Sequence, residues 1–106
     1  MGCRTKVRKV KGMPVLEISG EFIGEDATAA ALLLEKMRRS TGTAIAVDLS
    51  SATFIDSVGL GVFVYCWRLL DNEHRDMLFV KPQGFVLTML QNTSLDKVFK
   101  VVDAID

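Results

Sequence analysis

The alternation of apolar and polar positions at the amino end predicts strands. Two short segments, 6–11 and 15–19, mix valine, leucine and isoleucine with polar residues, and Gly12, Met13 and Pro14 separate them. Short runs of this kind, bounded by Gly and Pro, are typical of strands. A hairpin is the simplest connection between them.

The next segment, 26–39, has the pattern of an amphipathic helix. It contains neither Gly nor Pro. Its apolar residues recur at helical spacing and include Ala30, Leu33, Leu34 and Met37. Gly42 follows the segment and is predicted to end the helix.

Two almost unbroken apolar runs follow. The first, 44–49, has the length of a strand and predicts a central strand covered on both faces of a sheet. The second, 60–70, is longer, and a polar run over 71–76 follows it. The length of the second run and the polar residues that follow it favour a buried helix over a strand.

The remaining chain continues the alternation of strands and helices. Residues 77–80 predict a strand, and Pro82 suits the first turn of a third helix. Residues 93–99 predict a short closing helix or turn, and 100–102 a final strand. This order predicts one α/β domain over 1–106 with a small mixed β-sheet.

Composition and charge narrow the class of partner. The chain has 106 residues, of which 49% are hydrophobic, enough for one core. Thirteen basic and thirteen acidic residues balance, so no net field draws the chain to nucleic acid or to an anionic membrane. The basic residues crowd the first eleven positions, which we interpret as a solvated edge strand. Binding of a phosphate backbone is the weaker alternative.

The cysteines and the single histidine bear on compartment and cofactors. Cys3 and Cys66 lie far apart in the sequence, and Cys66 falls in an apolar helical run, where a packed, reduced thiol is expected. This predicts a reducing, cytoplasmic compartment. The longest apolar segment, 58–67, is short of the ~20 residues that span a bilayer. His74 has no Cys or carboxylate at ligand spacing, so we predict no metal and no cofactor.

The run from Asp56 to Gly61 lies between the central strand and the apolar helix. Asp56 or Ser57 is positioned to accept a hydrogen bond from a first-turn N–H group. Gly59 and Gly61 are unusual there, because glycine in a helix costs up to about 1 kcal/mol relative to alanine. Glycine is favoured where another helix or a partner protein approaches the backbone closely.

A nucleotide-binding loop is disfavoured at this position. The phosphate-binding loop needs a lysine followed by Ser or Thr after its second glycine, and the chain has Val62 and Phe63. The dinucleotide-binding pattern lacks its third glycine.

Hydrolase chemistry is disfavoured as well. A nucleophilic serine needs a base, and His74 would lie roughly 25 Å from Ser57 along one helix at ~1.5 Å per residue. The adjacent carboxylates Glu25 and Asp26 fit first-turn acids that complement a helix dipole better than a general acid and base. The sequence therefore predicts a binding protein and not an enzyme.

Ser57 remains as the candidate site of modification. A phosphate at a helix start would meet free N–H donors and the positive end of the helix dipole. It would add about −1.5 to −2 charges at pH 7, enough to repel a partner docked on the same surface. We therefore predict a phosphorylation-controlled binding module.

Taken together, the motifs resemble the STAS domain family, typified by bacterial anti-sigma-factor antagonists. The resemblance covers residues 15 to about 102. Its motifs are the segments 47–50, 54–61, 78–80 with Pro82, and 95–99. It implies a single STAS-like domain, with a small mixed sheet and helices packed mainly on one face.

The resemblance also implies partners and a mechanism. In the family, the serine at the position of Ser57 is phosphorylated by an anti-sigma-factor-type serine kinase and dephosphorylated by a PP2C-like phosphatase. The unphosphorylated form binds the kinase. Asp56 would help to present Ser57, and Gly59, Leu60 and Gly61 would form part of the docking surface.

Two positions depart from the pattern of the family. Val58 stands where Ser or Thr is frequent, and Ile23, after Gly20 and Glu21, stands where many antagonists have aspartate. Glu21, Ile23 and Val58 are predicted to lie at the partner-binding surface. The alternative is a STAS scaffold or ligand-sensing module that is not phosphorylated.

Overall fold

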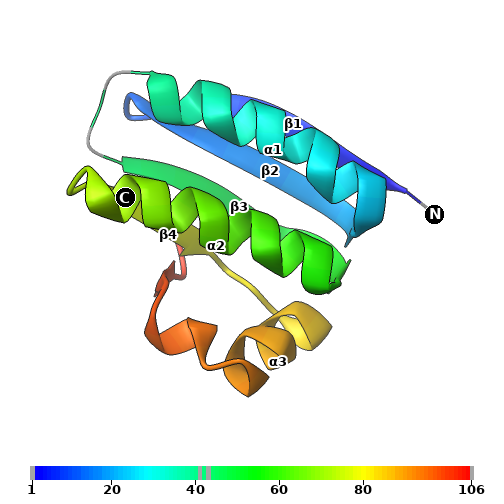
Figure 1. The fold of residues 1–106 in the computed structure, drawn as a ribbon. Helices are drawn as coiled ribbons and strands as arrows, with labels where there is room; N and C mark the ends of the chain where they lie inside the picture. Colours follow the sequence, from blue (N-terminus) through cyan, green and yellow to red (C-terminus); the bar gives the residue numbers. More distant parts are fainter. Residues whose placement is uncertain (1, 41, 43, 106) are drawn as a thin grey trace.

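The computed structural model describes residues 2–40, 42 and 44–105. Within these residues the chain forms one five-stranded sheet, three α-helices and a short 3-10 helix. The elements are β1 (Cys3–Val10), β2 (Met13–Phe22), α1 (Gly24–Arg39), β3 (Ala44–Ile55), α2 (Ser57–Asn72), β4 (Asp76–Val80), α3 (Gly84–Asn92), η1 (Leu95–Lys97) and β5 (Lys100–Val102). Figure 1 shows α1 and α2 side by side across one face of the sheet, with α3 beyond α2.

The sheet is mixed, and its strands are in the order of the sequence. β1 and β2 pair antiparallel, whereas β2 with β3, β3 with β4, and β4 with β5 pair parallel. Parallel neighbours need a crossover, and α1, α2 and α3 supply the three crossovers. The predicted α/β class with a small mixed sheet, and helices mainly on one face, is confirmed.

The main core lies between the sheet and the helices. Phe63 of α2 stacks on Phe22 of β2 with ring centroids 4.8 Å apart, and meets Phe79 of β4 edge-on at 5.2 Å. A smaller buried cluster, built on Val15, Ala46 and Val80, is separate from it. Because successive strand residues point to opposite faces, β3 supplies both clusters. This confirms that 44–49 forms a central strand covered on both faces.

The amino-terminal hairpin is confirmed, but its strands are longer than predicted. The turn contains only Lys11 and Gly12, at φ of 52° and 82°. Two residues of positive φ are typical of the tight hairpin turn that matches strand twist. Met13 and Pro14 belong to β2 and not to the turn. Pro14 is tolerated because the pairing of β2 with β3 begins only at Val15.

The prediction that Gly42 ends the first helix is wrong. α1 ends at Arg39, and the N–H of Ser40 donates to the carbonyl of Met37 at 3.1 Å. The Ser40 hydroxyl donates to the same carbonyl. Ser40 therefore closes the helix before Gly42 is reached.

The third helix begins later than predicted. Pro82 precedes the N-cap residue Gln83, and α3 starts at Gly84. The N–H of Lys81 donates to the carbonyl of Val102 at 2.8 Å, which extends the pairing beyond β4. The chain is thus held extended past the position where Pro82 was expected to open the helix.

The second helix is less buried than its composition suggests. α2 begins at Ser57 and packs Phe63 and Leu70 fully into the core. However, Val58 is 41% exposed and Tyr65 is 67% exposed. The prediction that 60–70 forms a helix packed in the core is confirmed, but one side of α2 faces solvent beside α1.

The basic amino end forms an edge of the sheet, as interpreted from the sequence. Among the strands of the described residues, β1 is the outermost and has β2 as its one neighbour. Arg4 and Lys6 are exposed, while Arg8 forms ion pairs with Glu17 and, at 3.6 Å, with Asp48. Charged side chains on an edge strand oppose the addition of another strand.

Candidate functional site

Asp56 lies where β3 ends and joins the starts of two helices. It is the N-cap of α2, and its Oδ1 accepts a hydrogen bond from the Gly59 N–H at 2.9 Å. Its Oδ2 accepts from the Gly24 N–H, the first of α1, at 3.1 Å. The predicted cap is confirmed and is supplied by Asp56. One carboxylate thus fixes both helix starts relative to each other.

Ser57 is the first residue of α2, and its side chain is exposed. In the part of the chain that the structure describes, no hydrogen bond involves its hydroxyl. His74 follows α2 at its opposite end. The hydroxyl is therefore accessible from outside and has no histidine base beside it.

The two glycines after Ser57 have different surroundings. Gly59 is buried, and a Cβ there would lie 2.5 Å from the carbonyl oxygen of Phe22 and 2.8 Å from the Ile55 side chain. Gly61 is exposed, and a Cβ there would meet nothing within 4 Å. The first glycine is explained by close packing of α2 on β2, and the second is not.

The other predicted site residues divide by exposure. Val58 is exposed, whereas Asp56, Glu21 and Ile23 are half-buried. Leu60, at 9% exposure, belongs to the core. Gly59 and Leu60 are therefore buried in the isolated chain and support the surface from beneath, and the docking role that the resemblance implies for them stays a prediction.

Ile23, one of the two departures from the family pattern, occupies the N-cap of α1. Its side chain cannot accept a hydrogen bond, and it caps no N–H group of the helix. The Gly24 N–H instead reaches Asp56. Glu25 and Asp26 follow in the first turn of α1, as expected of acids that complement the dipole.

The site is acidic. The segments 20–35 and 50–67, which meet at Asp56, contain no lysine, arginine or histidine. Glu21, Glu25 and Asp26 lie within three residues of Gly24, so they are within about 11 Å of it along an extended chain. These two segments therefore bring acidic and no basic side chains to the neighbourhood of Asp56.

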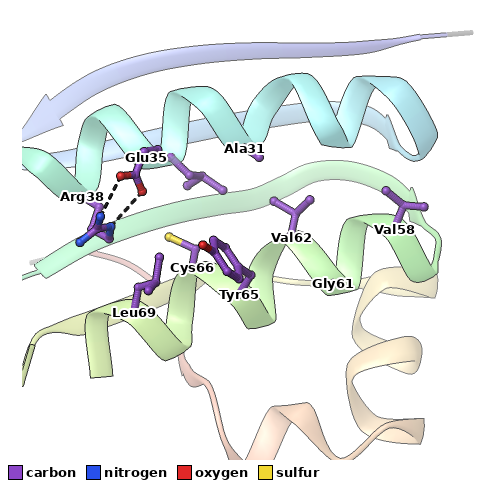
Figure 2. A pocket seen from close by; sticks show the side chains of 10 residues that line it. Ala31, Glu35, Arg38, Val58, Gly61, Val62, Tyr65, Cys66 and Leu69 are labelled. Carbon is purple, nitrogen blue, oxygen red and sulfur yellow. Dashed lines mark hydrogen bonds and ion pairs between the residues drawn. The ribbon is translucent and has the colours of Figure 1, made fainter. Parts of the chain in front are cut away.

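A groove runs between α1 and α2 and starts at Val58, the residue after Ser57 in the sequence (Figure 2). It has a volume of about 520 Å³. It is lined by Ala31, Leu34, Glu35 and Arg38 of α1 and by Val58, Gly61, Val62, Tyr65, Cys66 and Leu69 of α2. Of these, the sequence had singled out Val58 and Gly61 for partner binding; the others gave no signal, because the groove exists only where the two helices meet.

Charged side chains close one end of the groove. Arg38 donates to both carboxylate oxygens of Glu35, at 2.9 and 2.7 Å, and to Glu73 at 2.8 Å. The bonds from Arg38 lower the pKa of Glu35 to about 2, and the same pairing raises the pKa of Arg38. The polar end of the groove therefore carries matched charges.

The two cysteines differ in burial, since Cys66 is buried and Cys3 is half-buried. Cys66 is buried beside the groove, and burial raises the pKa of its thiol to about 11. Burial, with a smaller contribution from Asp26, also raises the pKa of Cys3. The expected packed thiol at Cys66 is confirmed.

Neither metal ligands nor a membrane span is found in the described part of the chain. No group of three or more His, Cys, Asp or Glu side chains there is arranged to hold a metal ion. None of the helices in residues 2–40, 42 and 44–105 combines the length and apolar character needed to cross a bilayer.

The mixed sheet with helices mainly on one face defines a small α/β domain of the SpoIIAA-like fold. The profile of the STAS domain family matches residues 4–106, and the chain belongs to that family.

Solved structures agree with this assignment. An anti-sigma factor antagonist from Mycobacterium paratuberculosis is 26% identical, with a TM-score of 0.85 over 99% of this chain and 89% of that one. A candidate anti-sigma factor antagonist from Thermotoga maritima is 25% identical, with a TM-score of 0.81 over 95% and 87%. The anti-sigma factor antagonist SpoIIAA in its unphosphorylated form is 17% identical, with a TM-score of 0.77 over 96% and 90%, which shows likeness of fold alone.

Proposed function

We propose that this chain is a phosphorylation-controlled partner-switching protein of the anti-sigma-factor antagonist kind. With Ser57 unphosphorylated, it binds an anti-sigma-factor-type serine kinase, and phosphorylation of Ser57 releases the kinase. A PP2C-like phosphatase restores the binding form. In this proposal the chain itself catalyses no reaction and acts in the cytoplasm.

The observation that carries the proposal is the exposure of Ser57 at the first position of α2. A kinase must reach the hydroxyl oxygen, and no hydrogen bond within the described residues occupies it. Asp56 is fixed by two N–H groups, so the backbone that presents Ser57 has a defined geometry. An accessible hydroxyl on a rigid support suits repeated modification.

Electrostatics explain how a phosphate would act. Asp56 directly precedes Ser57, and Glu21, Glu25 and Asp26 lie within three residues of Gly24, whose N–H donates to Asp56. A phosphate adds about −1.5 to −2 charges, and beside acidic residues it acts by repulsion and by the cost of desolvation. A docked partner that buries this surface would have to desolvate the phosphate, so binding is lost while the fold is retained.

The test is transfer of phosphate to the purified chain. Incubation with anti-sigma-factor-type serine kinases and ATP is expected to add one phosphate, detected by intact mass. Ser57→Ala should abolish the addition, while Ser51→Ala, at another exposed serine, should not. Phosphate on Ser57→Ala, or on none of the proteins, contradicts the proposal.

Binding gives the second measurement. Ser57→Ala should bind the kinase about as tightly as the unmodified chain, and Ser57→Asp should bind at least tenfold more weakly by calorimetry. If Ser57→Ala and Ser57→Asp bound the kinase with equal affinity, phosphorylation of Ser57 would not control binding.

A STAS scaffold that is not phosphorylated is the second candidate. The observation in its favour is Ile23 at the N-cap of α1, where many antagonists have aspartate. Here the carboxylate next to Ser57 is engaged by Gly24. Failure of every kinase tried to modify Ser57, with a partner bound equally by Ser57→Asp, would favour this candidate.

A further inference from the structure

Gly61 is a helical glycine that the chain itself does not require. Glycine weakens a helix relative to alanine, and at Gly59 the contact with Phe22 explains why it is present. At Gly61 a Cβ would meet no atom within 4 Å, and the backbone φ is not in the left-handed region. The open space beside Gly61 belongs to the groove between α1 and α2. Because Gly61 has no side chain, this space can hold an atom from another molecule.

The walls of the groove suit a protein side chain better than an enclosed small molecule. Sites for small ligands bury most of the ligand surface. Here Val58 and Tyr65 are 41% and 67% exposed, so the groove is open along its length. An apolar floor with the paired charges of Glu35 and Arg38 at one end has the pattern of a protein interface, with an apolar centre and a polar rim.

The groove is continuous with the surface around Ser57. Val58, the next residue, lines it, and Figure 2 shows Val58 and Val62 directed from α2 toward α1. From Val58 to Leu69 it extends about 16 Å at ~1.5 Å per residue. A standard interface covers about 800 Å² on each partner, which corresponds to a disc of about 16 Å radius. A partner centred on Ser57 therefore reaches the whole groove.

The charge near Ser57 indicates the chemistry of that partner. Within segments 20–35 and 50–67, Glu35 is paired with Arg38. The remaining acids are Glu21, Glu25, Asp26 and Asp56, and no basic residue of these segments offsets them. Complementary potential requires lysine or arginine on the partner.

We propose that the groove between α1 and α2 receives an apolar side chain of the protein partner that binds the surface around Ser57. Basic residues of the same partner flank that side chain. The inference rests on the proposed function, because the partner is the kinase that phosphorylates Ser57. Gly61 sets the depth of the groove. A second copy of this chain, docked groove to groove, would lack the required basic residues, because the end of the groove near Ser57 is acidic in both copies.

The experiment fills the groove from within. Gly61→Leu places a side chain in the open space, and Gly61→Ala does so with the smallest change. The matched control is Ala29→Leu, at an exposed position on α1 two residues before Ala31 and therefore about 200° around the helix from the groove. Affinity for the kinase that modifies Ser57 is measured by calorimetry without ATP, with thermal unfolding as the check on folding.

The proposal expects Gly61→Leu to weaken the Kd at least tenfold and Gly61→Ala to weaken it severalfold, while Ala29→Leu stays within about twofold. The affinity should also fall as salt rises. If both Gly61 variants fold and bind like the unmodified chain while Ser57→Asp does not, the groove inference is overturned and the switch stands. If Gly61→Leu weakens binding but Ser57→Asp does not, binding of the partner does not depend on Ser57 and the proposed function is contradicted. A dimer in sedimentation that Gly61→Leu dissociates also overturns the proposal.

Discussion

At the scale of single residues, the two glycines at the start of α2 have different roles: Gly59 allows close packing in the core, and Gly61 leaves open space at the surface. The sequence singled out Gly59 and Gly61 together, since glycine in a helix suggests close approach to the backbone. Only the packing of α2 on Phe22 distinguishes them. The hydrogen bond from the Gly24 N–H to Asp56 could not be predicted from the sequence either, because the two residues are 32 positions apart. Exposure of Ser57 followed from its place at a helix start.

This difference between the glycines gives a stability prediction. Gly59→Ala forces a Cβ to within 2.5 Å of the Phe22 carbonyl oxygen and should destabilise the fold by about 1–3 kcal/mol. Gly61→Ala meets no obstacle and should stabilise α2 by up to about 1 kcal/mol. Urea unfolding of the three proteins measures both shifts. Stabilisation of the fold by Gly59→Ala would show that Gly59 is not closely packed.

At the scale of elements, apolar periodicity predicted the type of each helix and strand, but not where several of them end. The end of α1 depends on Ser40 and on Arg75, whose guanidinium donates to the carbonyls of Arg38 and, at 3.4 Å, of Ser40. The start of α3 depends on the bond from Lys81 to Val102. Arg75 and Val102 lie 21 to 37 residues away from the groups that they bind, so a local pattern of Gly and Pro does not reveal them.

The cap that Arg75 provides can be tested. Its side chain is 16% exposed, and it also pairs with Glu73 at 3.2 Å. Arg75→Met keeps much of the stem but removes the donors to the end of α1, and should cost about 1–3 kcal/mol of unfolding free energy. Arg68→Met, at an exposed position of α2, should change it by no more than ~0.5 kcal/mol. If Arg75→Met and Arg68→Met changed the free energy of unfolding in urea equally, Arg75 would not act as a cap of α1.

At the scale of the whole molecule, the class of fold was predictable because the order of strands and helices allows few arrangements. The basic amino end also predicted which strand lies at an edge. The groove was not predictable, since α1 and α2 are separated by all of β3 and meet only in the folded chain. Its lining depends on which side of each helix faces the sheet.

The burial of Cys66 couples one side chain of this helix pair to global stability. Because the folded state holds the thiol pKa at about 11, against 9.0 for a free thiol, the unfolded chain loses its proton first as pH rises. The contribution of neutral Cys66 is therefore complete below pH 9 and declines as pH rises toward 11. Comparison with Cys66→Ala under reducing conditions removes the titration of all other groups. The difference in unfolding free energy between the two proteins should be constant from pH 7 to about 8 and should shrink between pH 9 and 11. A constant difference over the whole range would mean that the thiolate is tolerated between α1 and α2, and that the helices do not exclude water from this side chain.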